Sequence, residues 1–130
     1  MACLIVTEGP DTGRSLDLEV QPTVTIGRDR ECTFQILDDR ISRSHLKVGA
    51  TETGNHCAID SGSSNGTFVN DERIDARTEL TDGDVVRIGL TVMVYMTEES
   101  QITRKMEELA KRPGQRWQTT IAMDPPVKKP

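Results

Sequence analysis

Apolar and polar residues alternate along the chain from residue 2 to about residue 96, the period expected of strands with one buried face. Two such runs, at 2–6 and 15–20, flank a cluster of glycine, proline and aspartate residues at 9–13, and this arrangement predicts a β-hairpin. The same period predicts six further short strands, at 23–26, 46–48, 56–59, 67–69, 84–88 and 91–96. Many short strands at close spacing, with no helices between them, favour an all-β sandwich or a small barrel.

The period of the pattern changes after Thr97, which is suited to cap a helix that carries two glutamates in its first turn. Apolar residues then recur on one helical face, at Ile102, Met106 and Leu109. We expect this helix to dock on the sandwich through that stripe rather than to bind a partner. The sequence therefore predicts a sandwich over residues 1–97, a C-terminal helix over 98–112 and an extended, flexible tail over 113–130.

Composition narrows the classes of function. Aromatic residues make up only 3% of the chain, so the core must be aliphatic and few rings are available to stack on bases. The formal net charge is −5, which disfavours binding to nucleic acid or to an anionic membrane. An anion that this protein recognises must therefore be met by a local site. Nothing in the sequence calls for a metal ion or an organic cofactor.

The cysteines and the N-terminus indicate the compartment. Cys3, Cys32 and Cys57 are widely scattered and odd in number, which is typical of reduced thiols rather than of a disulfide framework. The first apolar run is too short for a signal peptide, and no stretch approaches the ~20 apolar residues of a membrane span. We therefore expect a cytoplasmic protein.

Three short motifs lie in loops between the predicted strands: Gly27-Arg28, Ser42-Arg43-Ser44-His45 and Ser64-Asn65-Gly66-Thr67. Each alone has a plain structural interpretation. Arg28 could be a surface charge balanced by Glu31, Asn65-Gly66 could be a type I′ turn, and His45 could be a packing residue. In this order and spacing, however, the three motifs resemble the signature of the forkhead-associated (FHA) domain over about residues 2–97.

This resemblance implies a two-sheet β-sandwich of about eleven short strands that binds phosphothreonine peptides through loops at one end. Arg28, Ser42, Ser64 and the backbone N–H of Arg43 would then hold the phosphate, and Asn65 would grip the peptide main chain. The remaining signature residues would shape the loops: Gly27, His45, Gly66, Thr67 and Asn70. One departure is Asn70-Asp71, where the family often has Asn-Gly.

By the same resemblance, the protein would be a non-catalytic module of Ser/Thr kinase signalling, whose partner is a phosphothreonine-containing protein, either a kinase or its substrate. A phosphate-dianion ligand suits such donors, because a phosphothreonine carries about −1.5 to −2 charges at pH 7. The competing hypothesis is a protein-interaction or oligomerisation domain that uses a sheet face and needs no phosphate.

Two further hypotheses, a serine hydrolase and a zinc site, have less support. The run 62–66 fits Gly-x-Ser-x-Gly, but a strand rather than a helix is predicted after it, which argues against a serine hydrolase built on Ser64, His45 and Asp60. Zinc is disfavoured because His56 and Cys57 are adjacent on a strand and point to opposite faces.

The tail offers one further hypothesis. Thr119 and Thr120 are adjacent hydroxyl residues that a kinase could phosphorylate, and the domain could then bind its own tail or that of a second copy. The plainer interpretation of this segment is a linker.

Overall fold

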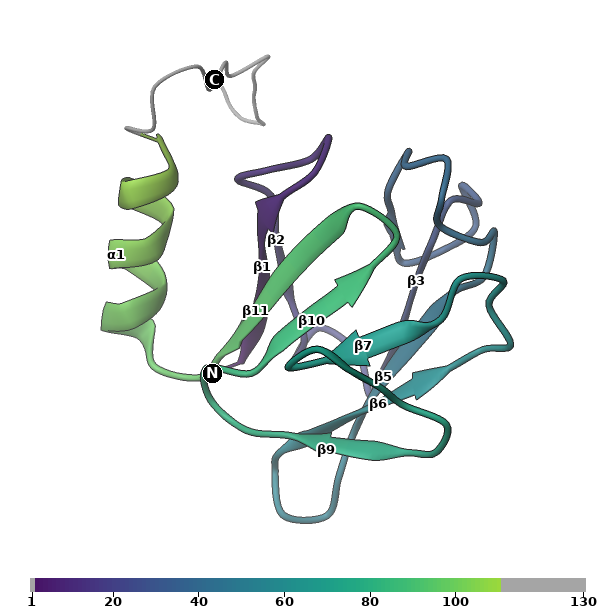
Figure 1. The fold of residues 1–130 in the computed structure, drawn as a ribbon. Coiled ribbons are helices and arrows are strands. Elements are labelled where there is room, and N and C mark those ends of the chain that lie inside the picture. The colour runs from purple at the N-terminus through teal and green to yellow at the C-terminus, as the bar shows by residue number, and fades with distance from the viewer. Residues whose placement is uncertain (1, 111–130) are drawn as a thin grey trace.

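The computed structural model describes residues 2–110 of the 130-residue chain. Within these residues two β-sheets face each other and one helix lies alongside (Figure 1). The predicted all-β sandwich with a C-terminal helix is confirmed. The elements are β1 (Cys3–Glu8), β2 (Ser15–Asp17), β3 (Thr23–Gly27), β4 (Phe34–Gln35), β5 (Leu46–Ala50), β6 (His56–Asp60), β7 (Thr67–Val69), β8 (Glu72–Arg73), β9 (Thr78–Leu80), β10 (Val85–Ile88), β11 (Thr91–Met96) and α1 (Glu99–Ala110).

The chain passes back and forth between the two sheets. The six-stranded sheet has the order β2-β1-β11-β10-β7-β8, and the five-stranded sheet has the order β4-β3-β5-β6-β9. All pairings are antiparallel except β3 with β4, which is parallel. The predicted hairpin is present as β1 and β2, with Leu4 opposite Leu16. Because the chain changes sheet several times, the connections between strands meet at the two ends of the sandwich.

Alternation explains which residues face the core. In β11, Thr91, Met93 and Tyr95 are buried, and the residues between them are half-buried. The interior is almost entirely aliphatic, as the composition predicts. Two polar groups that enter it are paired with each other: the hydroxyl of Tyr95 and Nδ1 of His56 lie 2.9 Å apart and form a hydrogen bond.

Helix α1 packs on the outer face of the six-stranded sheet, beside β1 (Figure 1). Ile102 and Leu109 are buried there against Cys3 and Ile5, which confirms that the helix docks through its apolar stripe. Burial, and secondarily the charge of Asp17, raises the pKa of the Cys3 thiol to about 11. Among residues 2–110, no helix is long and apolar enough to cross a membrane.

The start of α1 differs from the prediction. The helix begins at Glu99, and the first helical hydrogen bond runs from Ile102 N–H to Glu98 O. Thr97 does not cap it, since the carbonyl that accepts this first bond belongs to Glu98; both the N–H and the hydroxyl of Thr97 donate to the Asp82 carboxylate, at 2.8 and 3.1 Å. Thr97 therefore bonds to a residue 15 positions earlier in the chain instead of to the first turn of the helix, which is the partner that the local pattern predicts. The predicted end of the helix at residue 112 and the predicted tail lie outside the described residues.

Candidate functional site

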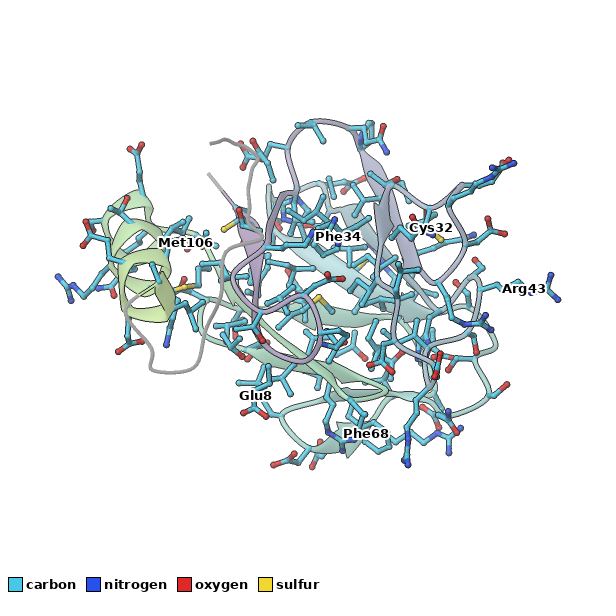
Figure 2. All side chains as sticks on the ribbon, turned by 90° about the horizontal axis from the view of Figure 1, so that it is seen from above. Glu8, Cys32, Phe34, Arg43, Phe68 and Met106 are labelled. Carbon is cyan, nitrogen blue, oxygen red and sulfur yellow. The ribbon has the colours of Figure 1, made fainter. Side chains whose placement is uncertain are left out.

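The three motifs come together at one end of the sandwich. Arg28 N–H donates to Ser42 O at 3.1 Å, and Ser64 N–H donates to the Ser42 hydroxyl oxygen at 3.0 Å. The side-chain amide of Asn65 donates to Arg40 O at 2.8 Å. The loops after β3, before β5 and before β7 therefore form one surface. Figure 2 shows Arg43 projecting from this surface, at the end of the molecule away from α1.

Arg28 is exposed, but its side chain is not free to swing. Its Nε donates to Ile41 O at 2.9 Å, which orients the guanidinium group. The two terminal nitrogens have no hydrogen-bond or ion-pair partner within residues 2–110, so the sequence hypothesis of a pair with Glu31 is wrong. A guanidinium held at Nε presents its remaining N–H groups to an anion.

Gly27 permits the close crossing of loops beneath this arginine. A Cβ atom at this position would overlap with the carbonyl group of Arg43. That carbonyl accepts hydrogen bonds from Asp29 N–H and from the Cys32 thiol. The glycine is therefore required by proximity, because any side chain would push the 28 and 43 loops apart.

Two hydroxyls and one amide complete the donor set. The Ser42 oxygen accepts the Ser64 N–H, which leaves the Ser42 hydroxyl hydrogen available to donate. Ser64 is exposed, and within residues 2–110 neither its hydroxyl nor the N–H of Arg43 has a hydrogen-bond partner. The arrangement can thus offer several donors, one of them attached to a permanent charge, to a single oxyanion.

His45 connects two of the loops from below. Its ring is fully buried, Nδ1 accepts the Ser42 N–H at 3.0 Å, and Nε2 lies 2.8 Å from Gly66 O. Because Nδ1 accepts, Nε2 carries the proton and donates to the carbonyl, so the ring is neutral. Both nitrogens are used in this way, and neither is bonded to Ser64. The geometry does not assemble the hydrolase triad.

Asp60 organises the Ser64 loop, a role that the sequence reasoning missed. Its carboxylate accepts the hydroxyls of Ser63 and Thr67 at 2.6 and 2.7 Å, and also the N–H groups of Gly62 and Ser63. Burial raises its pKa, but these hydrogen bonds outweigh burial and lower the pKa below its usual value. The sequence does contain a local indication of this role, because an aspartate at the end of a strand, followed by Ser-Gly-Ser, is typical of a turn in which the carboxylate accepts backbone N–H groups.

The two Asn-containing turns differ. Gly66 has a φ of 87°, but Asn65 does not have a positive φ, so Asn65-Gly66 is not a type I′ turn. Asn70 and Asp71 have φ values of 51° and 71° and form the tight β7–β8 turn instead. Asn70 also bonds through its amide to Asp84 and to Val85 N–H, which ties this turn to β10. It lies at the far end of β7 from Asn65, so the structure does not bring it to the phosphate donors.

The residues considered for zinc are separated. His56 faces the core against Tyr95, whereas the Cys57 sulfur accepts a hydrogen bond from Arg77 Nε at 3.0 Å. Within the part of the chain that the structure describes, no group of three or more His, Cys, Asp or Glu residues could hold a metal ion.

Comparison with known proteins agrees with this geometry. A family profile described as "FHA domain" matches residues 24–89. The glycogen accumulation regulator GarA of Mycolicibacterium smegmatis is 38% identical over 96 residues, covering 74% of this chain and 59% of that protein. The oxoglutarate dehydrogenase inhibitor of Corynebacterium glutamicum is 38% identical over 95 residues, covering 73% of this chain and 64% of that protein.

Among solved structures, a chain described in an analysis of phosphothreonine-dependent FHA domain interactions superposes with a TM-score of 0.66 at 28% identity. The match covers 75% of this chain and 96% of that one. The chain belongs to the FHA domain family, as the order of its three motifs predicts. It spans about 60% of the length of the two curated relatives above.

Proposed function

We propose that this protein is a non-catalytic module that binds phosphothreonine peptides in Ser/Thr kinase signalling. The observation that carries the proposal is the convergence of Arg28, Ser42 and Ser64, with the Arg43 N–H beside them, on one exposed surface. A phosphothreonine has three strong acceptor oxygens and nearly two negative charges, which matches this donor set. Asn65, next to Ser64, would hold the main chain of the peptide.

The energetics are consistent with a phosphate-dependent complex. A hydrogen bond to a charged group contributes about 1.5–3 kcal/mol, so three or four give a gross gain of order 5–10 kcal/mol. A micromolar complex requires about 8 kcal/mol. Since ordering the peptide offsets part of the gross gain, binding should depend on the phosphate rather than merely be improved by it.

The names of the relatives support a regulatory role. GarA is a glycogen accumulation regulator, and the Corynebacterium glutamicum protein is an oxoglutarate dehydrogenase inhibitor. For the present chain we propose a phosphorylated kinase or kinase substrate as the partner, and the cytoplasm as the compartment. No metal ion or organic cofactor enters the proposal.

The central test is the substitution Arg28→Gln, measured by calorimetric titration with a phosphothreonine peptide taken from a degenerate peptide library. Loss of the fixed charge and the bidentate donor should weaken binding at least 30-fold, because charge-assisted bonds contribute about 1.5–3 kcal/mol each. Arg30→Gln is the matched control, since Arg30 is also exposed and only two residues away.

The control should bind as the wild-type protein does. Equal affinity of the wild-type protein and Arg28→Gln would instead support the competing hypothesis, a sheet-face contact that needs no phosphate. Binding of the unphosphorylated peptide at equal strength would do the same.

We also propose Thr119 and Thr120 as phosphorylation sites through which the chain binds its own tail or that of a second copy. Both residues lie outside the described part of the chain, and support comes only from adjacent threonines in a chain that also carries the phosphate-binding signature. Mass spectrometry after co-expression with a Ser/Thr kinase should find phosphate on one of them, and Arg28→Gln should abolish the resulting self-association. An unmodified tail would contradict the hypothesis.

A further inference from the structure

The outer face of the six-stranded sheet is only partly covered within residues 2–110. Helix α1 packs over the β1 side of this face. On the other side, cross-strand register aligns Arg73 of β8 with Phe68 of β7, and Phe68 with Arg87 of β10. Cross-strand partners project from the same face of a sheet, so these three side chains form a row that we call the Arg73–Phe68–Arg87 strip. Phe68 lies along an open edge of the molecule in Figure 2.

Arg87 is held by stacking on the aromatic ring of the strip, whereas Arg73 lines a hollow together with Glu72, Asp75, Glu79 and Asp84. The guanidinium carbon of Arg87 lies 4.2 Å from the centroid of the Phe68 ring. Among residues 2–110, neither Arg73 nor Arg87 takes part in an ion pair. Arg73 and Arg87 are the two cross-strand neighbours of Phe68. Cation–π contact orients Arg87 without neutralising it, and Arg73 forms no ion pair within residues 2–110, so both guanidinium groups can bind an anion.

Arg73 connects the strip to the phosphate site. A Cβ atom placed on Gly66 would lie only 2.8 Å from Arg73 Nε, so the guanidinium rests directly against the backbone of Gly66. Gly66 follows Asn65, the residue assigned to the peptide main chain. A peptide that leaves Asn65 toward the sheet face therefore meets Arg73 first and Arg87 second.

The spacing of the two arginines and the residues around them limit which peptide segment could bind along the strip. Val85, which is 37% exposed, lies two residues before Arg87 on the same face of β10. Adjacent strands are about 4.8 Å apart, so Arg73 and Arg87 are separated by about 10 Å, the span of about three extended residues. Beyond Arg87, Val92 and then Glu8 follow in register, and Glu8 ends the positive stretch.

From these observations we infer that the strip is a second binding surface for the same phosphorylated partner. It takes an acidic segment at positions of the peptide beyond those held at Asn65, with two carboxylates about three residues apart. This inference rests on the proposed phosphothreonine function. It extends that function by assigning a partner chemistry to residues outside the phosphate site.

The test begins with a degenerate peptide library that has a fixed central phosphothreonine and seven random positions on each side. We expect the wild-type protein to enrich Asp and Glu four to seven residues from the phosphothreonine on one side. The double variant R73Q/R87Q should lose this distal enrichment but keep the selection within three residues of the phosphothreonine. The matched control K47Q/R104Q removes two exposed charges elsewhere and should behave as wild type.

A pair of defined phosphopeptides then measures how much the distal carboxylates add to the affinity, with no change in the protein. Both carry the residues selected nearest the phosphothreonine, and their distal extensions are Glu-Ala-Ala-Glu or Gln-Ala-Ala-Gln. The Glu peptide should bind wild type at least fivefold more tightly in low salt, and this advantage should shrink as salt rises. It should disappear in R73Q/R87Q.

The outcomes separate the two proposals. Equal affinity of the Glu and Gln peptides for wild type would overturn the strip inference and leave phosphothreonine binding intact. So would distal acidic selection that survives in R73Q/R87Q. If wild type fails to retain the phosphothreonine library at all, the proposed function itself is wrong, and the strip inference falls with it.

Discussion

At the scale of single residues, the site depends on groups that are held from below rather than on the exposed donors alone. His45 is neutral and joins Ser42 to Gly66, while Asp60 closes the loop that presents Ser64. Neither side chain needs to touch a ligand to matter. Removing either side chain would leave buried or half-buried polar partners without their hydrogen bonds, and the loops that carry Ser42 and Ser64 would no longer be held in place.

Asp60 gives a testable pH dependence at this scale. Its pKa is lowered in the folded protein, so its stabilising contribution is present above about pH 4, where the unfolded residue titrates, and is lost as pH falls through the lower folded value. Asp60→Asn should reduce the free energy of unfolding by about 1–3 kcal/mol at pH 7. Urea unfolding of both proteins at pH 7 and pH 3 should show this difference shrinking in acid.

Asp39→Asn is the control for that measurement, since Asp39 is exposed and accepts no hydrogen bond within the described residues. It should change stability little at either pH. A difference for Asp60→Asn that stays constant from pH 7 to pH 3 would contradict the assigned role of the carboxylate.

At the scale of elements, the turn between β7 and β8 has an aspartate at a left-handed position that glycine adopts most easily. Asp71 has a φ of 71°, which is costly for a residue with a Cβ atom. Asp71→Gly should therefore raise the free energy of unfolding by up to about 1 kcal/mol, the relief of left-handed strain less the extra entropy of glycine in the unfolded chain. Thermal and urea unfolding would measure it.

Asp75→Gly serves as the comparison, because Asp75 is an exposed aspartate whose φ is not positive. There, glycine only adds freedom to the unfolded chain, and stability should fall by about 0.5–1 kcal/mol. Equal losses for both substitutions would show that the β7–β8 turn stores no strain.

At the scale of the whole molecule, the proposed phosphate site lies at one end of the sandwich, and helix α1 lies away from it (Figure 2). The charge of the ligand then gives a prediction that concerns the complete complex. Because the second pKa of a phosphate ester is about 6, the affinity for a phosphothreonine peptide should weaken below that pH. Titrations at pH 7.5 and 5.5 should differ several-fold, and equal affinities would count against a site selective for the dianion.

Much of this protein could be predicted from sequence because the informative patterns are short-range. The two-residue period of Thr91–Met96 follows from the pleat of a strand, and the apolar repeat of Ile102 and Leu109 follows from helical geometry. The FHA signature likewise consists of short motifs in a fixed order. These features pointed to the sandwich, the docked helix and the donors of the candidate site.

What the tertiary structure decided involves residues far apart in the chain. The two-residue strands β4 and β8 and the three-residue β9 are too short for a periodic signal and exist only because a neighbouring strand offers its edge. Thr97 bonds to Asp82 instead of capping the helix, and Arg73 rests on Gly66. Strand register and the crossing of loops settle such contacts, and both depend on the packing of the two sheets together rather than on any local run of residues.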